Sequence, residues 1–236
     1  MTQAQAFFDR AMALDPGNIE ALVGLARVKA AFAGNLETDD WKAHLAAAEA
    51  LLIRALSLAP NHARAHSVLG LVQSFTNRGV QGIAECERAL ALDHNLADAH
   101  GFIGLAKFFL GRSEETEAHI REALRLSPRD NNAYRWLMFV GLAKFFLGAD
   151  VEAVAWLRRS IEANRNHPVP HYYLAAALAL LGSLDEARAA AQAGLVLSPT
   201  FTLRRFRSSA KNNNPAYLAG RERAYEGMRL AGVPEG

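Results

Sequence analysis

Eight histidine residues are the side chains of this sequence best suited to bind a metal ion. A four-coordinate zinc site needs ligands that converge on one point of the fold. His66, His100 and His171 are widely separated, and the second interval is about twice the first. Such wide and regular spacing predicts equivalent places in separate structural units rather than one ligand set. We therefore predict no metal site, and we expect these histidines to pack within the fold.

Nucleophilic and phosphate-binding chemistry has equally little support. Cys86 is the single cysteine, and it falls on the face of a helix that we expect to be buried, where a free thiol behaves as a small apolar group. The sequence contains no GxSxG elbow, no GxxxxGK[ST] phosphate loop and no HExxH zinc motif. We predict that the protein is not an enzyme, has no catalytic residues and needs no cofactor.

Composition and charge predict a cytoplasmic protein. About half of the 236 residues are apolar, which favours folding by burial, and a single cysteine favours a reducing compartment. The N-terminus does not resemble a signal peptide, and the longest apolar run is too short to span a membrane. Residues 199–236 carry seven Arg and Lys against three Glu, which gives this segment +4 in a chain of net charge +2. This charge is too modest for us to expect a nucleic-acid or membrane partner.

The helices that would position a functional side chain form a repeating pattern in the sequence. The octapeptide GLAKFFLG occurs at 104–111 and again at 141–148. Helix-like segments end at Pro60, His94 and Pro128, at equal intervals of about 34 residues, a period typical of repeats built from two helices and a turn. The slightly longer interval after Pro128 predicts extra residues in a first helix or in the turn before it. The still longer interval before Pro60 predicts a lengthened turn around GNLETDDWKAHL, at 34–45.

Small residues recur at one place in the second helix of each repeat, where they would let two helices approach closely. They are Ala4, Ala48, Gly82, Ala153 and Ala187, and Thr116 is the exception. We expect this place to be buried at a close contact between two helices.

The combined pattern resembles the tetratricopeptide repeat (TPR) family. A large residue in each first helix is followed three places later by an apolar one, at Leu22 and Leu25, His66 and Leu69, His100 and Ile103, Tyr134 and Leu137, and His171 and Leu174. The resemblance implies an all-α fold, a right-handed TPR superhelical solenoid of antiparallel helix pairs. It covers residues 1–201, divided into a half repeat at 3–18, a repeat with an insertion at 19–62, and repeats at 63–96, 97–130, 131–167 and 168–201. Residues 202–236 are predicted to form a basic helix and a C-terminal capping helix.

A closer resemblance involves the stretches at 76–111, 156–168 and 217–236. They are similar to the C-terminal TPR region of bacterial adenylate or guanylate cyclase-like signalling proteins. This resemblance implies that the chain is the regulatory part of a larger signalling protein. The half repeat at 3–18 agrees with a chain that begins inside a repeat.

The first helices of TPR solenoids line a concave groove, and aromatic and arginine side chains suit a groove that binds peptides. We predict that the groove binds a peptide or protein segment of unknown identity through Arg27, Arg64, Phe108, Phe109, Arg135, Phe139, Phe145 and Tyr172. The phenylalanines have an alternative role, which is packing against adjacent repeats. A second hypothesis is a self-association module that forms a homodimer through the half repeat and controls an upstream cyclase-like or DNA-binding domain.

Overall fold

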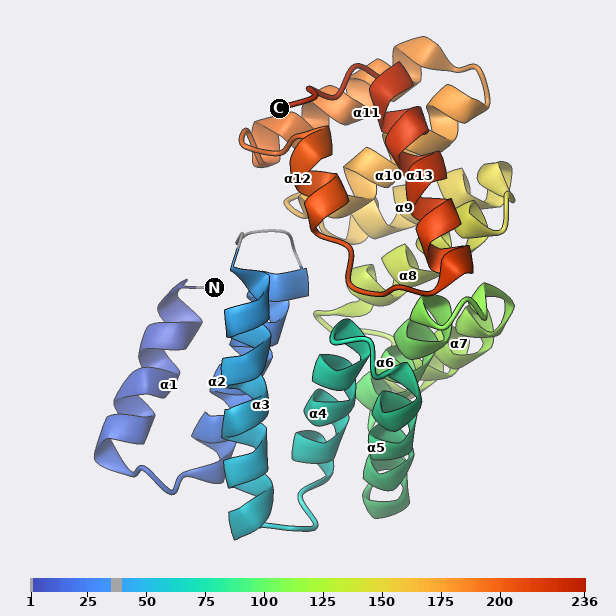
Figure 1. Ribbon diagram of the computed structural model, residues 1–236. Helices are drawn as coiled ribbons and strands as arrows, with labels where there is room; N and C mark the ends of the chain where they lie inside the picture. Colours follow the sequence, from blue (N-terminus) through green and yellow to red (C-terminus); the bar gives the residue numbers. More distant parts are fainter. Residues whose placement is uncertain (1, 35–39) are drawn as a thin grey trace. The chain divides into compact units, whose positions relative to one another are not determined.

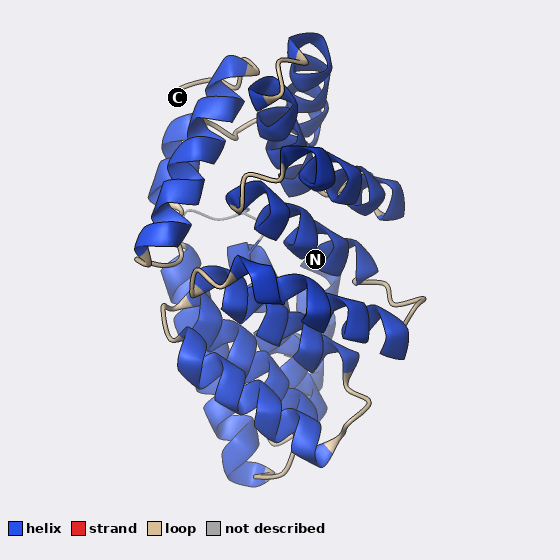
Figure 2. Cartoon of the chain, turned by 90° about the vertical axis from the view of Figure 1, so that its right-hand side faces the viewer, coloured by secondary structure: helices blue, strands red, loops and turns tan. Residues whose placement is uncertain are grey.

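The computed structural model describes residues 2–34 and 40–236, and these residues form helices joined by short turns (Figures 1 and 2). No strand occurs in the described ranges, so the predicted all-α fold class is confirmed. The helices are α1 (Thr2–Leu14), α2 (Ile19–Gly34), α3 (Trp41–Leu58), α4 (Ala63–Phe75), α5 (Gly79–Leu92), α6 (Ala97–Phe109), the short 3₁₀ helix η1 (Ser113–Glu115), α7 (Thr116–Leu126), α8 (Ala133–Phe146), α9 (Asp150–Ala163), α10 (Pro168–Leu180), α11 (Leu184–Leu197), α12 (Leu203–Ser208) and α13 (Pro215–Leu230).

The chain divides into two compact units, an N-terminal unit of Met1–Ala106 and a C-terminal unit of Lys107–Gly236. Helices α12 and α13 pack within the C-terminal unit, and the predicted boundary after residue 201 stays a prediction. Each unit is built from helix pairs, such as α4 with α5 and α8 with α9.

The two intervals that depart from the period have different explanations. The turn before α8 spans 127–132 and is longer than the turn at 93–96, and α8 is also longer than α6, at 14 against 13 residues. The lengthened turn predicted at 34–45 lies partly at 35–39, outside the described residues. Its second half is helical, because the Asp40 side chain accepts a hydrogen bond from the amide of Ala43 (3.4 Å) and begins α3 at Trp41.

Small residues bring α4 and α5 into close antiparallel contact in the N-terminal unit. Gly70 faces Cys86, and Ser74, one turn further along α4, faces Gly82, one turn earlier on α5. A Cβ atom added to Gly82 would lie 2.6 Å from the carbonyl oxygen of Gly70, so a larger side chain does not fit there. Close packing of this kind stabilises helices that are too short to stand alone in water.

The other predicted contact residues mostly behave in the same way. Ala48, Ala153, Ala187 and Thr116 are fully buried. The expectation for Ala4 is wrong, because this residue is exposed on α1. Helix α1 contacts α2 through Phe8, whose ring lies against Gly24, and this contact leaves Ala4 in solvent.

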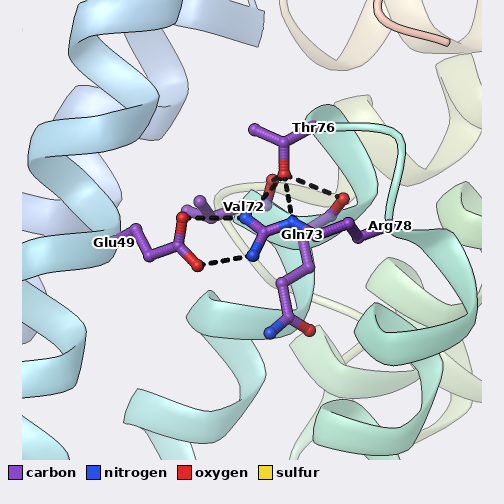
Figure 3. Close-up of polar contacts among 5 residues, drawn as sticks. All are labelled: Glu49, Val72, Gln73, Thr76 and Arg78. Carbon is purple, nitrogen blue, oxygen red and sulfur yellow. Dashed lines mark hydrogen bonds and ion pairs between the residues drawn. The ribbon is translucent and has the colours of Figure 1, made fainter.

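A polar cluster joins the first two helix pairs of the N-terminal unit (Figure 3). The guanidinium of Arg78, at the start of α5, donates two hydrogen bonds to the Glu49 carboxylate on α3, at 2.7 and 2.8 Å. Thr76 accepts hydrogen bonds from Arg78 Nε and Nη2, and its hydroxyl lies 3.0 Å from the Val72 carbonyl at the end of α4. The hydrogen bond with Glu49 raises the pKa of Arg78. The cluster fixes the α4–α5 turn against α3.

Candidate functional site

An aromatic cluster in the C-terminal unit brings together four helices. Phe108 and Phe109 come from the end of α6, Phe146 from the end of α8, and all three rings surround Tyr217 of α13. The distances between the Tyr217 ring centroid and those of Phe108, Phe109 and Phe146 are 5.7, 5.2 and 5.8 Å. Tyr173 of α10 extends the cluster, 6.3 Å from Phe146. These distances are typical of stabilising aromatic pairs. We call the rings of Phe108, Phe109, Phe146 and Tyr173, with the parts of α6, α8 and α10 that carry them, the aromatic face.

Helix α13 covers the aromatic face because small residues let it approach closely. Within the C-terminal unit it lies against α10 and α8 (Figure 1). A Cβ atom at Gly220 would lie 2.2 Å from the Phe146 ring, and one at Gly227 would lie 2.7 Å from the Ala176 carbonyl oxygen. Ala224 lies between these two glycines and is fully buried.

Two polar side chains of the α13 segment bind the ends of the first helices. The amide of Asn214 donates to the Leu110 carbonyl just after α6 (3.0 Å), while its oxygen accepts from the Ala216 amide (2.9 Å) and begins α13. Arg223 donates to the Phe145 carbonyl at the end of α8 (2.9 Å) and forms an ion pair with Asp150. The Phe145 carbonyl also accepts from the Gly148 amide (3.0 Å), so Arg223 adds a second hydrogen bond to it, while Asn214 supplies a donor to the Leu110 carbonyl.

Arg221 is a buried cation that joins α13 to α12. Its side chain is almost fully buried and donates to the Phe206 carbonyl, the Ser209 hydroxyl (3.3 Å) and the Tyr217 hydroxyl (3.4 Å). The guanidinium also stacks over the Phe206 ring, 3.9 Å from its centroid. A buried guanidinium is costly unless its donors are satisfied, and these contacts satisfy it.

The five aromatic residues predicted to bind a peptide are all buried, each less than a tenth exposed: Phe108, Phe109, Phe139, Phe145 and Tyr172. Phe145 lies under the guanidinium of Arg223, at 4.5 Å from its ring centroid. Tyr172 stacks on Phe201 at 3.8 Å, and its hydroxyl donates to the Gly194 carbonyl (2.9 Å). The packing role that we considered for the phenylalanines therefore describes this structure, and the predicted role in binding a segment stays a prediction.

The three predicted arginines are more accessible. Arg64 is exposed at the start of α4. Arg27 is 41% exposed and forms an ion pair of 2.8 Å with Asp98 of α6. The guanidinium of Arg135 lies 5.7 Å from the Tyr134 ring and donates to its hydroxyl (3.0 Å). These arginines can still contact a charged or aromatic partner.

His66, His167 and Cys86 are buried within the fold. Among the described residues, no group of three or more His, Cys, Asp or Glu is placed to hold a metal ion. His66 is buried and bridges the Glu85 carboxylate (2.6 Å) and the Pro60 carbonyl (2.9 Å). His167 lies edge-on to Tyr134, and burial lowers its pKa to about 3, with smaller contributions from Arg135 and His171. Burial raises the pKa of the Cys86 thiol, which disfavours the reactive thiolate.

Sequence reasoning missed the residues of α13 that cover the aromatic face. The helix itself is visible in the sequence, because Asn214 and Pro215 begin it and Gly232 follows it. Its small residues, Gly220, Ala224 and Gly227, recur at helical spacing and could have indicated a close helix contact. Nothing in the repeat period shows which helices such a segment contacts.

Comparisons with known proteins agree with this architecture. Residues 97–130 match the family model described as tetratricopeptide repeat, and these are the bounds of one of the predicted repeats. No curated protein matches the sequence. In the described residues, no helix has the length and apolar character needed to cross a membrane.

Solved structures of similar fold include several TPR-like chains. PilF of Pseudomonas aeruginosa is 20% identical, with 89% of this chain and 88% of that chain covered and a TM-score of 0.62. TTC0263, a TPR protein of Thermus thermophilus, is 19% identical over 86% of this chain and 99% of its own, with a TM-score of 0.62. PilW, a type IV pilus biogenesis factor, is 20% identical over 86% and 90%, with a TM-score of 0.61. These matches confirm the predicted TPR fold.

Proposed function

We propose that this chain is a non-catalytic protein-interaction module that binds a protein or peptide segment on the faces formed by its first helices. The observation that carries this proposal is the aromatic face of the C-terminal unit. It accommodates a complete helix, α13, through aromatic, backbone and charged contacts. A surface with these groups has the chemistry of protein interfaces, where aromatic residues and arginine are enriched.

The predicted arginines supply the orienting contacts in this proposal. Arg64 is exposed on α4, and its guanidinium can bind a carboxylate or stack on an aromatic ring of the partner. Arg27 and Arg135 already contact Asp98 and Tyr134, so a partner would share or replace these contacts. Arg27 and Arg64 belong to the N-terminal unit and are proposed to contact a partner there, while Phe108 and Phe109 belong to the aromatic face of the C-terminal unit, which α13 covers.

The test begins with the selection, from a displayed library, of peptides that bind to the full chain. The affinity of the full chain for each selected peptide is then measured by titration. We expect Arg64→Ala to weaken binding by about fivefold to fiftyfold, the range for loss of a charge-assisted hydrogen bond. Arg88→Ala is the matched control, because Arg88 is exposed on the second helix α5. Equal affinities of the wild type and both variants for every selected peptide would contradict the proposed role of Arg64. Failure to select any ligand would contradict the proposed function.

The proposed cellular context is the regulatory part of a larger cytoplasmic signalling protein. It rests on the resemblance of residues 76–111, 156–168 and 217–236 to the TPR region of cyclase-like proteins. The complete reading frame of the gene tests this context. An upstream cyclase-like domain would support it, and a frame that encodes no further domain would contradict it.

Self-association is the second candidate, and the exposed apolar side chains of α1 favour it. Phe7 is 69% exposed and Leu14 is 89% exposed, and the two lie two helical turns apart, on one face of the helix. Packing this face against a second copy would remove apolar surface from water. The aromatic face of the C-terminal unit has no comparable exposure, since α13 covers it.

Light scattering at several protein concentrations tests this candidate. A dimer formed through α1 would increase with concentration in the wild type and weaken in Phe7→Glu. Val80→Glu is the control, because Val80 is exposed to a similar degree, 67%, on α5. A monomer at every concentration, or an equal effect of both substitutions, would contradict dimerisation through α1.

A further inference from the structure

We infer that the aromatic face is a helix-receiving site, that α13 is its resident occupant within the same chain, and that the partner's binding segment is an amphipathic helix with the contact pattern of α13. The identity of the partner segment rests on the proposed function. The occupancy by α13 stands on the structure of the C-terminal unit alone.

The packing of α13 sets it apart from the stacked helix pairs. If the repeat period of about 34 residues continued, a first helix would follow α11 at 202–214 and a second helix at 218–231. Helix α12 covers only the beginning of the expected first helix at 202–214, because it ends at Ser208. Helix α13 then packs on α10 and α8, the first helices of two earlier pairs. It is therefore added to the face of the repeats instead of continuing their stack.

The contacts of α13 are those of a bound helix. Its buried side chains recur at helical spacing along one face: Tyr217, Gly220, Arg221, Ala224, Gly227 and Met228. Its 16 residues span about 24 Å at about 1.5 Å per residue, enough to cross several helices. Outside this face the helix is polar or exposed, with Glu222 and Arg229 in solvent.

Specific recognition comes from three kinds of group on the aromatic face. The rings of Phe108, Phe109 and Phe146 receive one aromatic side chain, Tyr217. The backbone of α10 at Ala176 receives a residue without a side chain, Gly227. The Asp150 carboxylate and the Phe145 carbonyl receive one guanidinium, that of Arg223.

A partner helix for this site would carry the same groups at the same spacing. It would have an aromatic residue, small residues three, seven and ten places later, and an arginine six places after the aromatic one. Such a helix binds only when α13 has left the face, so the apparent affinity of the site is reduced by the fraction of time that α13 occupies it. In this way α13 controls access to the site.

The experiment uses a fluorescent synthetic peptide of residues 213–236 and the full chain. In the Gly227→Val chain, the added side chain meets the Ala176 backbone, which we expect to expel α13 and leave the receiving face unchanged. We expect this variant to bind the peptide about tenfold or more tightly than the wild type does. Ala219→Val is the matched control, because Ala219 is exposed on α13. A peptide that itself carries Gly227→Val should not bind to any of the chains.

The inference is overturned if the folded Gly227→Val chain binds the peptide no better than the wild type and Ala219→Val chains do. It is also overturned if Gly227→Val unfolds the C-terminal unit, because α13 would then be part of its core and not an occupant. Amide hydrogen exchange of the wild type gives an independent readout. We expect α13 to exchange faster than α8 and α10, and exchange of all three in one global step would contradict a helix that opens by itself.

The outcome separates this inference from the proposed function. If library peptides bind but the residue 213–236 peptide does not bind to Gly227→Val, the chain is an interaction module whose site lies elsewhere. If the 213–236 peptide binds but no library peptide does, the receiving site exists and the proposed partner binding is wrong.

Discussion

The ring of Tyr217 on α13 stands edge-on to the ring of Phe109 on α6, with centroids 5.2 Å apart and an angle of 71° between the planes. This pair joins residues that are far apart in the sequence, one in a repeat and one in the C-terminal segment. It closes the aromatic face over Phe108 and Phe146, which contact the same tyrosine.

Replacing Tyr217 by Ala should destabilise the packing of α13 on the rest of the C-terminal unit. The substitution removes a buried ring from the aromatic face and leaves a cavity, which typically costs about 3 to 5 kcal/mol for an aromatic residue. Tyr217→Phe keeps the ring and loses only a long hydrogen bond with Arg221 (3.4 Å), so it should cost less than about 1 kcal/mol. Urea unfolding followed by circular dichroism measures both. Equal losses in the two variants would show that the ring contacts contribute little.

Arg221 should not tolerate a change to Lys. A lysine keeps the charge but lacks the planar guanidinium that reaches the Phe206 carbonyl and stacks on the Phe206 ring. We expect Arg221→Lys to lower the free energy of unfolding by about 1 to 3 kcal/mol, since buried groups lose their hydrogen bonds. Arg229→Lys, at an exposed position of α13, should change it by less than about 0.5 kcal/mol. If lysine at 221 were as stable as arginine, charge alone would account for the role of this residue.

The sequence predicted the repeats well because their contacts repeat with them. Ala153 and Ala187 lie one repeat period apart, and both are buried at equivalent contacts. The same reasoning failed for Ala4, since the contact requires a helix on each side and α1 contacts α2 through a different face. A periodic pattern predicts which residues contact a neighbouring helix only where that neighbouring helix is present.

The aromatic residues could not be placed from the sequence for a related reason. Phe108 and Phe145 fall on the first helices, as predicted, but their exposure depends on α13, which does not pack as the second helix of a further repeat. The pattern of Tyr217, Gly220, Ala224 and Gly227 predicts a helix with one closely packed face. It does not predict that this face meets α10 and α8 rather than the adjacent helix α11.

Gly82 offers a direct test of the close contact between α4 and α5. A methyl group there would lie 2.6 Å from the Gly70 carbonyl oxygen, and backbone atoms move less easily than side chains. We expect Gly82→Ala to cost about 1 to 3 kcal/mol from overpacking, although alanine favours the helix by up to about 1 kcal/mol. Thermal unfolding measures the change, and Val80→Ala on the exposed side of α5 is the control. A stabilised Gly82→Ala variant would mean that the two helices separate at little cost.

The ion pair of Arg78 and Glu49 should couple the second helix pair to the first. Its two hydrogen bonds are well formed, but Arg78 is 37% exposed, so solvent screens the pair. A double-mutant cycle with Arg78→Met and Glu49→Gln should give a coupling energy of about 0.5 to 1 kcal/mol that falls at high salt. A coupling energy near zero at low salt would show that the two side chains act independently.

Acid should destabilise the C-terminal unit through His167. Burial lowers the pKa of this histidine from 6.5 to about 3, so the folded chain keeps it neutral where the unfolded chain takes up a proton. Stability from this group is complete above pH 6.5 and is lost progressively as the pH falls from about 6.5 to about 3. Burial also lowers the pKa of His171, which acts in the same direction.

Urea unfolding at pH 7.5 and pH 5 measures this effect. We expect the wild type to lose about 1 to 2 kcal/mol between these values on account of His167, because each pH unit below 6.5 corresponds to about 1.4 kcal/mol at most. His167→Gln cannot take up a proton and should lose correspondingly less, while His94→Gln, at an exposed position, should lose as much as the wild type. Carboxylates such as Glu117, whose pKa is lowered, act mainly below this window. Equal pH dependence of His167→Gln and the wild type would mean that His167 is protonated as readily in the folded chain as in the unfolded one.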